Sequence, residues 1–266
     1  VWALHEQICA GKFRPSGFEV SFADVGDLEA VNVRFGERGR IRLQGRIDRI
    51  DTVETDDTVY VKIIDYKTGM TQFDPVSLYY GLQLQLVVYL NAALEMERKL
   101  HKDKQVVPAG IFYYRMQDPV LEKEAGEEDA RIQEKLLKKL RPDGVLNSDQ
   151  EVLRLLDMGM NGDSLVIPAG TKKNGELKAA SSVATTEQFE KLSGFVTGKL
   201  AKMGEQILNG VIEVKPFSDK NGSACDFCDF QDVCGFDRKL SGMCEKRVSE
   251  LSKNEAWERI VAEAEE

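Results

Sequence analysis

The stretch "GRIDRIDTVETDDTVYVKIIDYKTG", residues 45–69, decides the fold, because its pattern predicts two β-strands joined by a short polar turn. Centring the hairpin on the Asp-Asp pair within "ETDDT" places Asp48 directly opposite Asp65 on the neighbouring strand. Lys67 lies two residues beyond Asp65, so its side chain projects from the same face. The stretch therefore predicts a hairpin that carries two facing carboxylates and one ammonium group.

Carboxylates that face each other across a hairpin repel unless a positive group lies between them. Mg²⁺ binds a few carboxylate oxygens, keeps several waters and leaves room for a phosphate. We therefore expect Asp48, Asp65 and the backbone carbonyl of Tyr66 to bind Mg²⁺ or Mn²⁺. Lys67 would hold or activate the nucleophile and offset charge on phosphorus. The alternative is a surface salt bridge, of Asp65 with Lys67 or of Asp48 with an arginine; the apolar run "VYVKII" disfavours it because it predicts a buried strand.

The segments that precede the hairpin continue the β pattern. Residues 1–11 predict the end of a helix that stops near Gly11, and "GFEVSF", "AVNVRFG" and "RIRLQGRIDRIDTV" predict strands. With the second strand of the hairpin they give three or four antiparallel strands in sequence, which favours a meander.

The segment that follows the hairpin changes to a helical pattern from Val76 to about Leu100, with Asp74-Pro75 as a start signal. "PAGIFYYRM" then predicts another strand. A strand, a long helix and a strand are consistent with a parallel crossover. The expected apolar face of the helix comprises Leu78, Leu82, Leu86, Tyr89 and Ala93.

The chain divides into four predicted regions: a core over 1–117, an insertion over 118–185 that packs around the core, a long helix over 186–214, and a cysteine-rich segment with a polar tail over 215–266. Short helical patterns in the insertion cover 127–140 and 149–157. Thr185 or Thr186 caps the long helix and Gly210 ends it, and a last helix is expected near 254–264.

Composition bounds the function. The 266 residues are 42% hydrophobic and 30% charged, an ordinary globular profile, and no run approaches the roughly 18 apolar residues of a membrane span. A net charge of −9 argues against coating nucleic acid by bulk electrostatics. The arginines of "VRFGERGRIRLQGRIDR" are either a local DNA track or solvated strand residues: Arg34, Arg38, Arg40, Arg42, Arg46 and Arg49. The start "VWALHEQI", without an initiator Met, suggests a piece of a longer protein.

Three of the five cysteines lie in "CDFCDFQDVC". The C-x₂-C-x₅-C spacing of Cys225, Cys228 and Cys234 lets thiolates from one tight loop reach a common centre, either zinc or an iron–sulfur cluster. By geometry alone zinc is favoured as the commoner structural metal. An odd, clustered set without a visible secretory signal predicts a metal site in a reducing compartment, hence a cytoplasmic protein.

The order "GRID", "IIDYKTG", "QLVVY" resembles the RecB-type branch of the PD-(D/E)XK nucleases. The resemblance implies an α/β fold with a restriction-endonuclease-like core, a central mixed sheet flanked by helices. It implies that Asp48 is the first metal-binding acid, Asp65 the second and Lys67 the catalytic lysine. Gln85 and Tyr89 match a Gln-x-x-x-Tyr pair that borders the active site and contacts DNA; ordinary helix packing is the alternative for these two.

The same family places a His or Glu on a helix before the sheet as a further metal ligand. His5 and Glu6 lie on a predicted helix. However, "EQICAGKFRPSGFEVSF" looks like the helix just ahead of the sheet, so we expect the ligand-bearing helix farther upstream. His5 and Glu6 are then solvated helix positions.

"ACDFCDFQDVCGFD" is similar to the C-terminus of AddB-type subunits of helicase–nuclease complexes. The resemblance implies a C-terminal iron–sulfur segment, in which Cys225, Cys228 and Cys234 join a fourth cysteine, upstream of the nuclease motifs, around a [4Fe–4S] cluster. Neither Cys9 nor Cys244 lies where the family places that ligand, and we expect both to be buried as small hydrophobic residues.

The resemblance further implies a metal-dependent DNA exonuclease that processes double-strand ends for recombinational repair, cuts the strand that ends 5′ at the break and acts on unwound single strands. An AddA-type helicase–nuclease subunit would be the partner and supply the motor, since no G-x-x-x-x-G-K-[ST] phosphate loop occurs here. Two alternatives stay open: a free-standing RecB-like iron–sulfur nuclease of the CRISPR-adaptation type, and a non-catalytic DNA-end-binding module.

Overall fold

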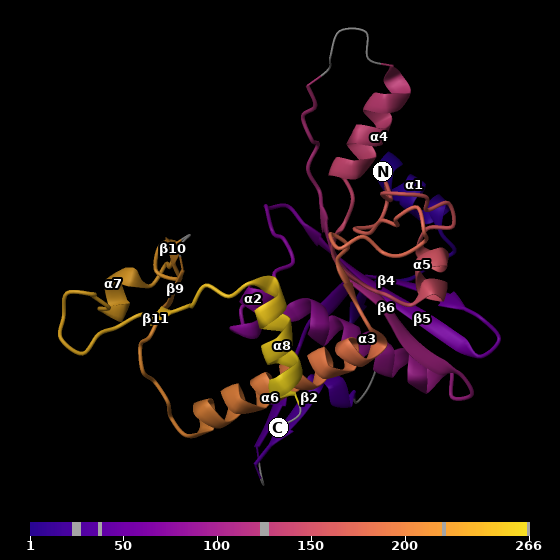
Figure 1. Ribbon diagram of the computed structural model, residues 1–266. Coiled ribbons are helices and arrows are strands. Elements are labelled where there is room, and N and C mark those ends of the chain that lie inside the picture. The colour runs from indigo at the N-terminus through magenta and orange to yellow at the C-terminus, as the bar shows by residue number, and fades with distance from the viewer. Residues whose placement is uncertain (23–27, 37–38, 123–127, 220–221, 265–266) are drawn as a thin grey trace.

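A six-stranded mixed sheet forms the centre of the computed structural model, which describes all residues except 23–27, 37–38, 123–127, 220–221 and 265–266 (Figure 1). The order is β1-β4-β5-β6-β7-β8, with β5–β6 and β7–β8 parallel and the other neighbours antiparallel. The strands are β1 (Arg14–Ser21), β4 (Arg46–Glu54), β5 (Thr58–Lys67), β6 (Gln105–Arg115), β7 (Asp143–Asn147) and β8 (Val183–Ala184). The predicted mixed sheet is confirmed.

The β4–β5 hairpin has the predicted register. Its paired residues run from Arg49–Ile64 to Glu54–Val59, and one further step along this ladder brings Asp48 opposite Asp65. The Thr55 hydroxyl closes the turn by accepting from the Thr58 backbone N–H at 3.2 Å. A closed turn and apolar residues on both faces fix the register, because a slip of one residue would exchange the two faces.

The crossover from β5 to β6 is parallel as predicted, but its helix is broken in two: α2 (Pro75–Tyr79) and α3 (Gln85–Leu100). Asp74 caps α2, since its carboxylate accepts from the Ser77 backbone N–H at 3.0 Å. Gly81, with φ +87°, turns the chain out of the helical path. The prediction of one continuous helix is therefore wrong, and Leu82, expected on its apolar face, is exposed.

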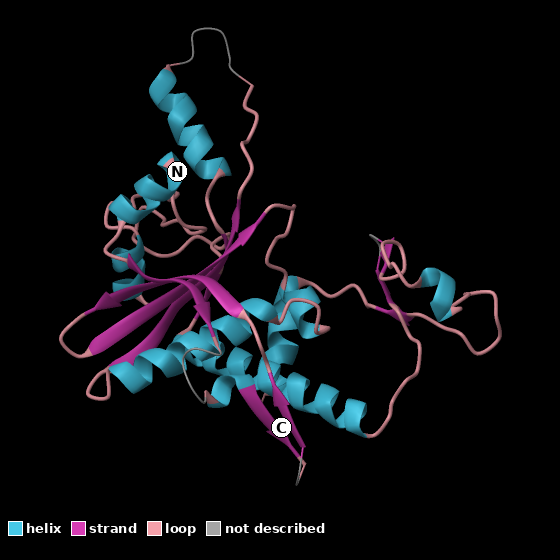
Figure 2. Ribbon diagram, turned by 180° about the vertical axis from the view of Figure 1, so that it is seen from behind, coloured by secondary structure: helices cyan, strands magenta, loops and turns pink. Residues whose placement is uncertain are grey.

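Helices cover both faces of the sheet (Figures 1 and 2). Alternate residues of β5 divide between two apolar clusters: Ile63 packs with the side that carries α3 and α6 (Thr186–Leu208), whereas Ile64 packs with α5 (Gln150–Leu156). The N-terminal helix α1 (Trp2–Ala10) joins the α5 side, where its Leu4 and Ala10 pack. The helices α1, α6 and α8 (Lys253–Glu263) agree with the predictions, and Thr185 caps α6 through a capping box. No described helix is long and apolar enough to cross a bilayer.

The predicted meander is wrong. β1 pairs with β4, and the intervening β2 (Asn32–Phe35) and β3 (Gly39–Arg42) form a separate two-stranded ribbon, preceded by the short 3₁₀ helix η1 (Glu29–Val31). The ribbon packs on α6: a Cβ added to Gly204 would lie 2.4 Å from the Phe35 ring and 2.8 Å from Ile41. Apolar residues on one face of the ribbon are thus buried against a helix rather than against the sheet.

Residues 118–185 contain the two predicted helices, α4 (Asp129–Lys139) and α5. They also contain β7 and β8, which extend the central sheet, so this segment does not merely pack around the core. β7 lies so close to β6 that a Cβ on Gly144 would be 2.0 Å from the Ile111 carbonyl oxygen. The proposed division of the chain into four regions stays a prediction.

The cysteine-rich segment stands apart from the sheet in both views (Figures 1 and 2). It holds a small three-stranded sheet and one short helix: β9 (Phe217–Asp219), β10 (Gly222–Ser223), β11 (Lys246–Arg247) and α7 (Gln231–Cys234). After it, α8 returns to pack on α2 and α6.

Candidate active site

The acidic residues of the hairpin meet where β4 begins and β5 ends. The Asp48 carboxylate accepts from the Tyr66 backbone N–H at 2.8 Å, which fixes its position against β5. Asp65 is 2% exposed, and its Oδ2 lies 2.6 Å from the Lys67 ammonium nitrogen. The structure therefore brings together the three hairpin residues that the sequence singled out.

The site continues onto the first turn of α3. Lys67 donates to the Gln85 side-chain oxygen at 3.2 Å, and the Gln85 amide donates to the Tyr89 hydroxyl at 2.7 Å. Tyr89 is buried and packs edge-on against Phe22. Gln85 is the first residue of α3, so the break after α2 determines where its amide meets Lys67.

Electrostatics at Asp65 favour the protonated form in the absence of a further cation. Burial raises the pKa of its carboxyl most, Lys67 lowers it, and the charge of Asp48 raises it again, with a net rise above the ordinary value. Burial, together with Asp65 and Asp143, raises the pKa of the adjacent Tyr113 to about 12. A divalent cation between the carboxylates would offset the repulsion that Asp48 exerts on Asp65.

The oxygen atoms of the site suit a hard divalent cation. Asp65 Oδ2 is buried and has no hydrogen bond from any described residue, although Lys67 lies within ion-pair distance. A buried acceptor without a donor is costly unless something else satisfies it. No third His, Cys, Asp or Glu joins Asp48 and Asp65 within the described ranges. Two carboxylates match Mg²⁺, which usually keeps several of its waters.

The comparison with protein families decides the class. The model of the PD-(D/E)XK nuclease superfamily matches residues 1–235. The chain belongs to this superfamily. The matched region of the nuclease includes Asp48, Asp65 and Lys67 and extends one residue beyond Cys234.

Curated relatives of the nuclease are subunits of one kind of enzyme, an ATP-dependent helicase/deoxyribonuclease. The chain is 39% identical over 261 residues to such a subunit of Clostridium acetobutylicum, with 98% of this chain and 22% of the relative covered. The corresponding protein of Clostridium kluyveri is 34% identical over 261 residues, with 98% and 23% covered. That of Lachnoclostridium phytofermentans is 38% identical over 271 residues, with 98% and 22% covered. The chain spans about a quarter of the length of these relatives.

A buried charge network supports the nuclease site from the opposite face of the hairpin. Arg49 donates to both carboxylate oxygens of Asp51, at 2.6 and 2.7 Å, and to the Tyr66 hydroxyl at 3.2 Å. Tyr66 lies between Asp65 and Lys67, and its own N–H binds Asp48. Arg49 is 3% exposed, so it is neither part of a DNA track nor solvated. Charged residues alternating with isoleucine in "RIDRID" are the signal that sequence reasoning passed over.

His5 and Glu6 lie far from the carboxylates in the fold. Helix α1 covers the α5 side of the sheet, whereas Lys67 and Gln85 meet on the α3 side. The His5 and Glu6 side chains are 70% and 41% exposed and lie 3.7 Å apart. Their expected status as solvated helix positions agrees with the structure.

The structure does not gather the cysteines into one centre. Cys225 and Cys228 share a turn and are half-buried, Cys234 is exposed, and no metal-binding group of three is found among the described residues. Cys9 and Cys244 are exposed, so their expected burial is wrong. Cys9 lies on the outer side of α1, with its sulfur 3.6 Å from His5 Nε2, and Cys244 lies in a segment too small to enclose it.

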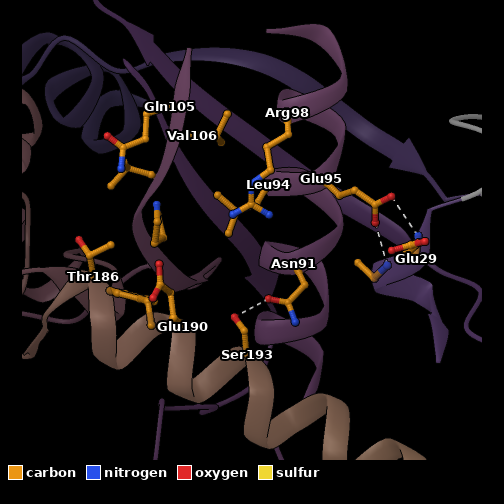
Figure 3. A pocket seen from close by; sticks show the side chains of 14 residues that line it. Glu29, Asn91, Leu94, Glu95, Arg98, Gln105, Val106, Thr186, Glu190 and Ser193 are labelled. Atoms are coloured by element: carbon orange, nitrogen blue, oxygen red, sulfur yellow. Dashed lines mark hydrogen bonds between the residues drawn. The ribbon is translucent and has the colours of Figure 1, made fainter. Parts of the chain in front are cut away.

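A cavity of about 430 Å³ lies between α3 and α6, near the start of β6 (Figure 3). Ser193 donates to Asn91 at 2.6 Å across it, and Arg98 and Glu190 lie at its walls. Its lining includes none of the catalytic candidates, which adjoin the opposite end of the β5–β6 pair. The cavity is therefore separate from the nuclease site.

Proposed function

We propose that this chain is the nuclease domain of a helicase–nuclease subunit and a metal-dependent deoxyribonuclease. The observation that carries the proposal is the convergence of Asp48, Asp65 and Lys67 at the end of one hairpin, with Asp65 Oδ2 buried and lacking a hydrogen bond. Membership of the superfamily and the names of the relatives support it.

The residues have distinct tasks in the proposed reaction. Asp48, Asp65 and the Tyr66 carbonyl would hold Mg²⁺ or Mn²⁺, which supplies polarisation of the phosphodiester and easier deprotonation of the attacking water. Lys67 places its ammonium beside the reacting phosphate and stabilises the negative charge that develops there. Gln85 accepts a hydrogen bond from Lys67 and is itself held by Tyr89, so the two orient the lysine and border the strand that is cut.

The experiment compares the full-length parent protein with Asp65→Asn and Lys67→Ala, in degradation of single-stranded DNA with Mg²⁺ or Mn²⁺. We expect each variant to lose at least about 100-fold in rate, in the range found for removal of one electrostatic stabiliser. Glu54→Gln and Lys104→Ala are matched controls, because they break another carboxylate–lysine pair, 2.9 Å apart, at the far end of the same hairpin. Rates equal to the parent in both site variants would instead favour a DNA-end-binding module.

The wider role follows from the relatives. We infer that the domain acts as an exonuclease on strands unwound from duplex ends, in recombinational repair in the cytoplasm, beside an AddA-type subunit that supplies the motor. The words helicase and deoxyribonuclease in the relatives' names support this assignment. Degradation of end-labelled duplexes with and without ATP, and with the 5′ or the 3′ end labelled, tests the need for a motor and the expected cutting of the 5′-ended strand.

We also infer that Cys225, Cys228 and Cys234, with a fourth cysteine, bind a [4Fe–4S] cluster in the full-length protein. The thiol spacing supports the inference, and so do the exposed Phe227 and Phe230, at 98% and 70%. Such side chains are expected to become covered when a metal centre folds the segment around itself. Iron, sulfide and zinc analysis of anaerobically prepared protein is the test; stoichiometric zinc without iron would contradict the cluster.

A further inference from the structure

The β2–β3 ribbon has one apolar face and one basic face. Val33 and Phe35 are buried, and Phe35 packs against α6 at Gly204. The alternate residues Arg34, Arg40 and Arg42 are exposed on the opposite face. The ribbon is therefore anchored by its apolar face and presents three guanidinium groups to solvent.

The basic face is not neutralised. Arg34 pairs directly with Arg40 across the ribbon, an arrangement of like charges that destabilises a strand pair. None of the three arginines has an acidic partner in the part of the chain that the structure describes, although the chain has a net charge of −9. By contrast, Arg46 forms an ion pair with Glu19 at 2.7 Å. An anionic ligand would relieve the repulsion on the ribbon.

The basic face leads to the catalytic carboxylate. From Arg40 to Arg46 the even-numbered residues are exposed and the odd-numbered ones are half-buried, an alternation with period two that runs from β3 into β4. Asp48 is the next even-numbered residue after Arg46. Asp48 follows Arg42 by six residues, so the two lie at most about 20 Å apart along the chain.

We propose that the basic face of the β2–β3 ribbon binds the phosphate backbone of single-stranded DNA and guides it to the β4–β5 hairpin. The inference rests on the proposed function, because it takes the cut strand as the ligand. Regularly repeated cations fit a polyanion better than a single anion, and arginine binds phosphate through two parallel hydrogen bonds. Arg38 lies outside the described residues and has no part in the proposal.

The test is the binding of a fluorescent oligothymidylate to the full-length protein in EDTA, where no cation is present to support cleavage. The variant is Arg34→Gln/Arg40→Gln/Arg42→Gln. Each phosphate contact on a single strand contributes about 0.7 to the slope of log Kobs against log salt, so the slope should fall by about 2. Between about 50 and 200 mM salt, the parent should lose about 20-fold more affinity than the variant. The control Lys12→Gln/Arg154→Gln/Lys173→Gln removes the same charge from exposed residues on the α5 side of the sheet.

The outcomes separate this proposal from the proposed function. We expect the ribbon variant to unfold at the parent's temperature or above it, to keep its rate on a dinucleotide and to lose rate on long strands, whereas Asp65→Asn loses both activities. An unchanged salt slope, or the same loss in the control variant, would overturn the ribbon proposal alone. A loss confined to duplex binding, or to association with a partner subunit, would assign the face to duplex DNA or to an acidic protein surface and overturn it too.

Discussion

Asp65 combines burial with a charged neighbour, and the two raise its pKa by separate routes. Burial disfavours the charged form, Asp48 adds repulsion, and Lys67 offsets part of both. A carboxyl whose folded pKa exceeds its ordinary value of 3.8 binds more protons when folded. The free energy of unfolding therefore falls as pH rises from that value through the raised folded pKa, and stays lower above it.

The first prediction concerns this carboxyl without metal. In EDTA at neutral pH, Asp65→Asn should unfold at a higher urea concentration than the parent, and the difference should disappear below the ordinary Asp pKa. Excess Mg²⁺ should reverse the order, because only the parent gains stability by binding it. Urea titrations across pH measure both effects. Glu54→Gln is the control of opposite sign, since Lys104 lowers the pKa of Glu54; a gain in this variant as large as in Asp65→Asn would contradict the explanation.

The second prediction concerns the network beneath the site. Arg49→Met should cost about 3–5 kcal/mol, because it leaves Asp51 buried with Lys62 as its remaining ion-pair partner, at 3.1 Å. Arg49→Met/Asp51→Leu should cost less than the sum of the two single changes, since no uncompensated carboxylate remains. Urea unfolding of the double-mutant cycle measures the coupling; additive costs would show that the pair is not a unit.

Among the elements, the break between α2 and α3 positions Gln85. Gly81 has φ +87°, and a Cβ there would lie 3.1 Å from the Met203 terminal carbon. The third prediction is that Gly81→Ala costs about 1–2 kcal/mol of stability and lowers kcat by moving the start of α3. Gly198→Ala in α6 is the matched control: a Cβ there meets no atom within 4 Å, and the change should add about 0.5–1 kcal/mol. Urea unfolding and the rate on single-stranded DNA measure the two effects, and equal effects of the two changes would contradict the prediction.

The sequence predicts local elements of this fold better than their partners. The register of β4–β5 follows from one turn and two apolar runs, all within a single stretch. The pairing of β1 with β4 does not, because alternation in β2 and β3 shows that one face is buried but not that α6 buries it. β7 escapes prediction because it is short, lacks alternation and follows a proline.

For the site, residue types and spacing predict the hairpin residues together with Gln85. They do not distinguish Arg49 from the exposed arginines of the same segment, since its burial depends on Asp51 and Tyr66 across two strands.

In the whole molecule, the cysteine-rich segment is a loop with both ends attached to the nuclease core. It leaves at the end of α6 and returns as α8, whose Ile260 is fully buried and whose Glu263 accepts from the Tyr79 hydroxyl at 2.6 Å. Closing a loop of this size costs roughly 3 kcal/mol of chain entropy. That cost sets the effective concentration of α8 at α2.

Order within the loop therefore acts at a distance. A segment that becomes rigid shortens the freely moving chain between α6 and α8 and raises the effective concentration of α8 at its docking surface. α2 forms that surface, and the chain passes from it through Gly81 to Gln85. Residues that never contact the hairpin can thus determine how much of the time the start of α3 is held in place.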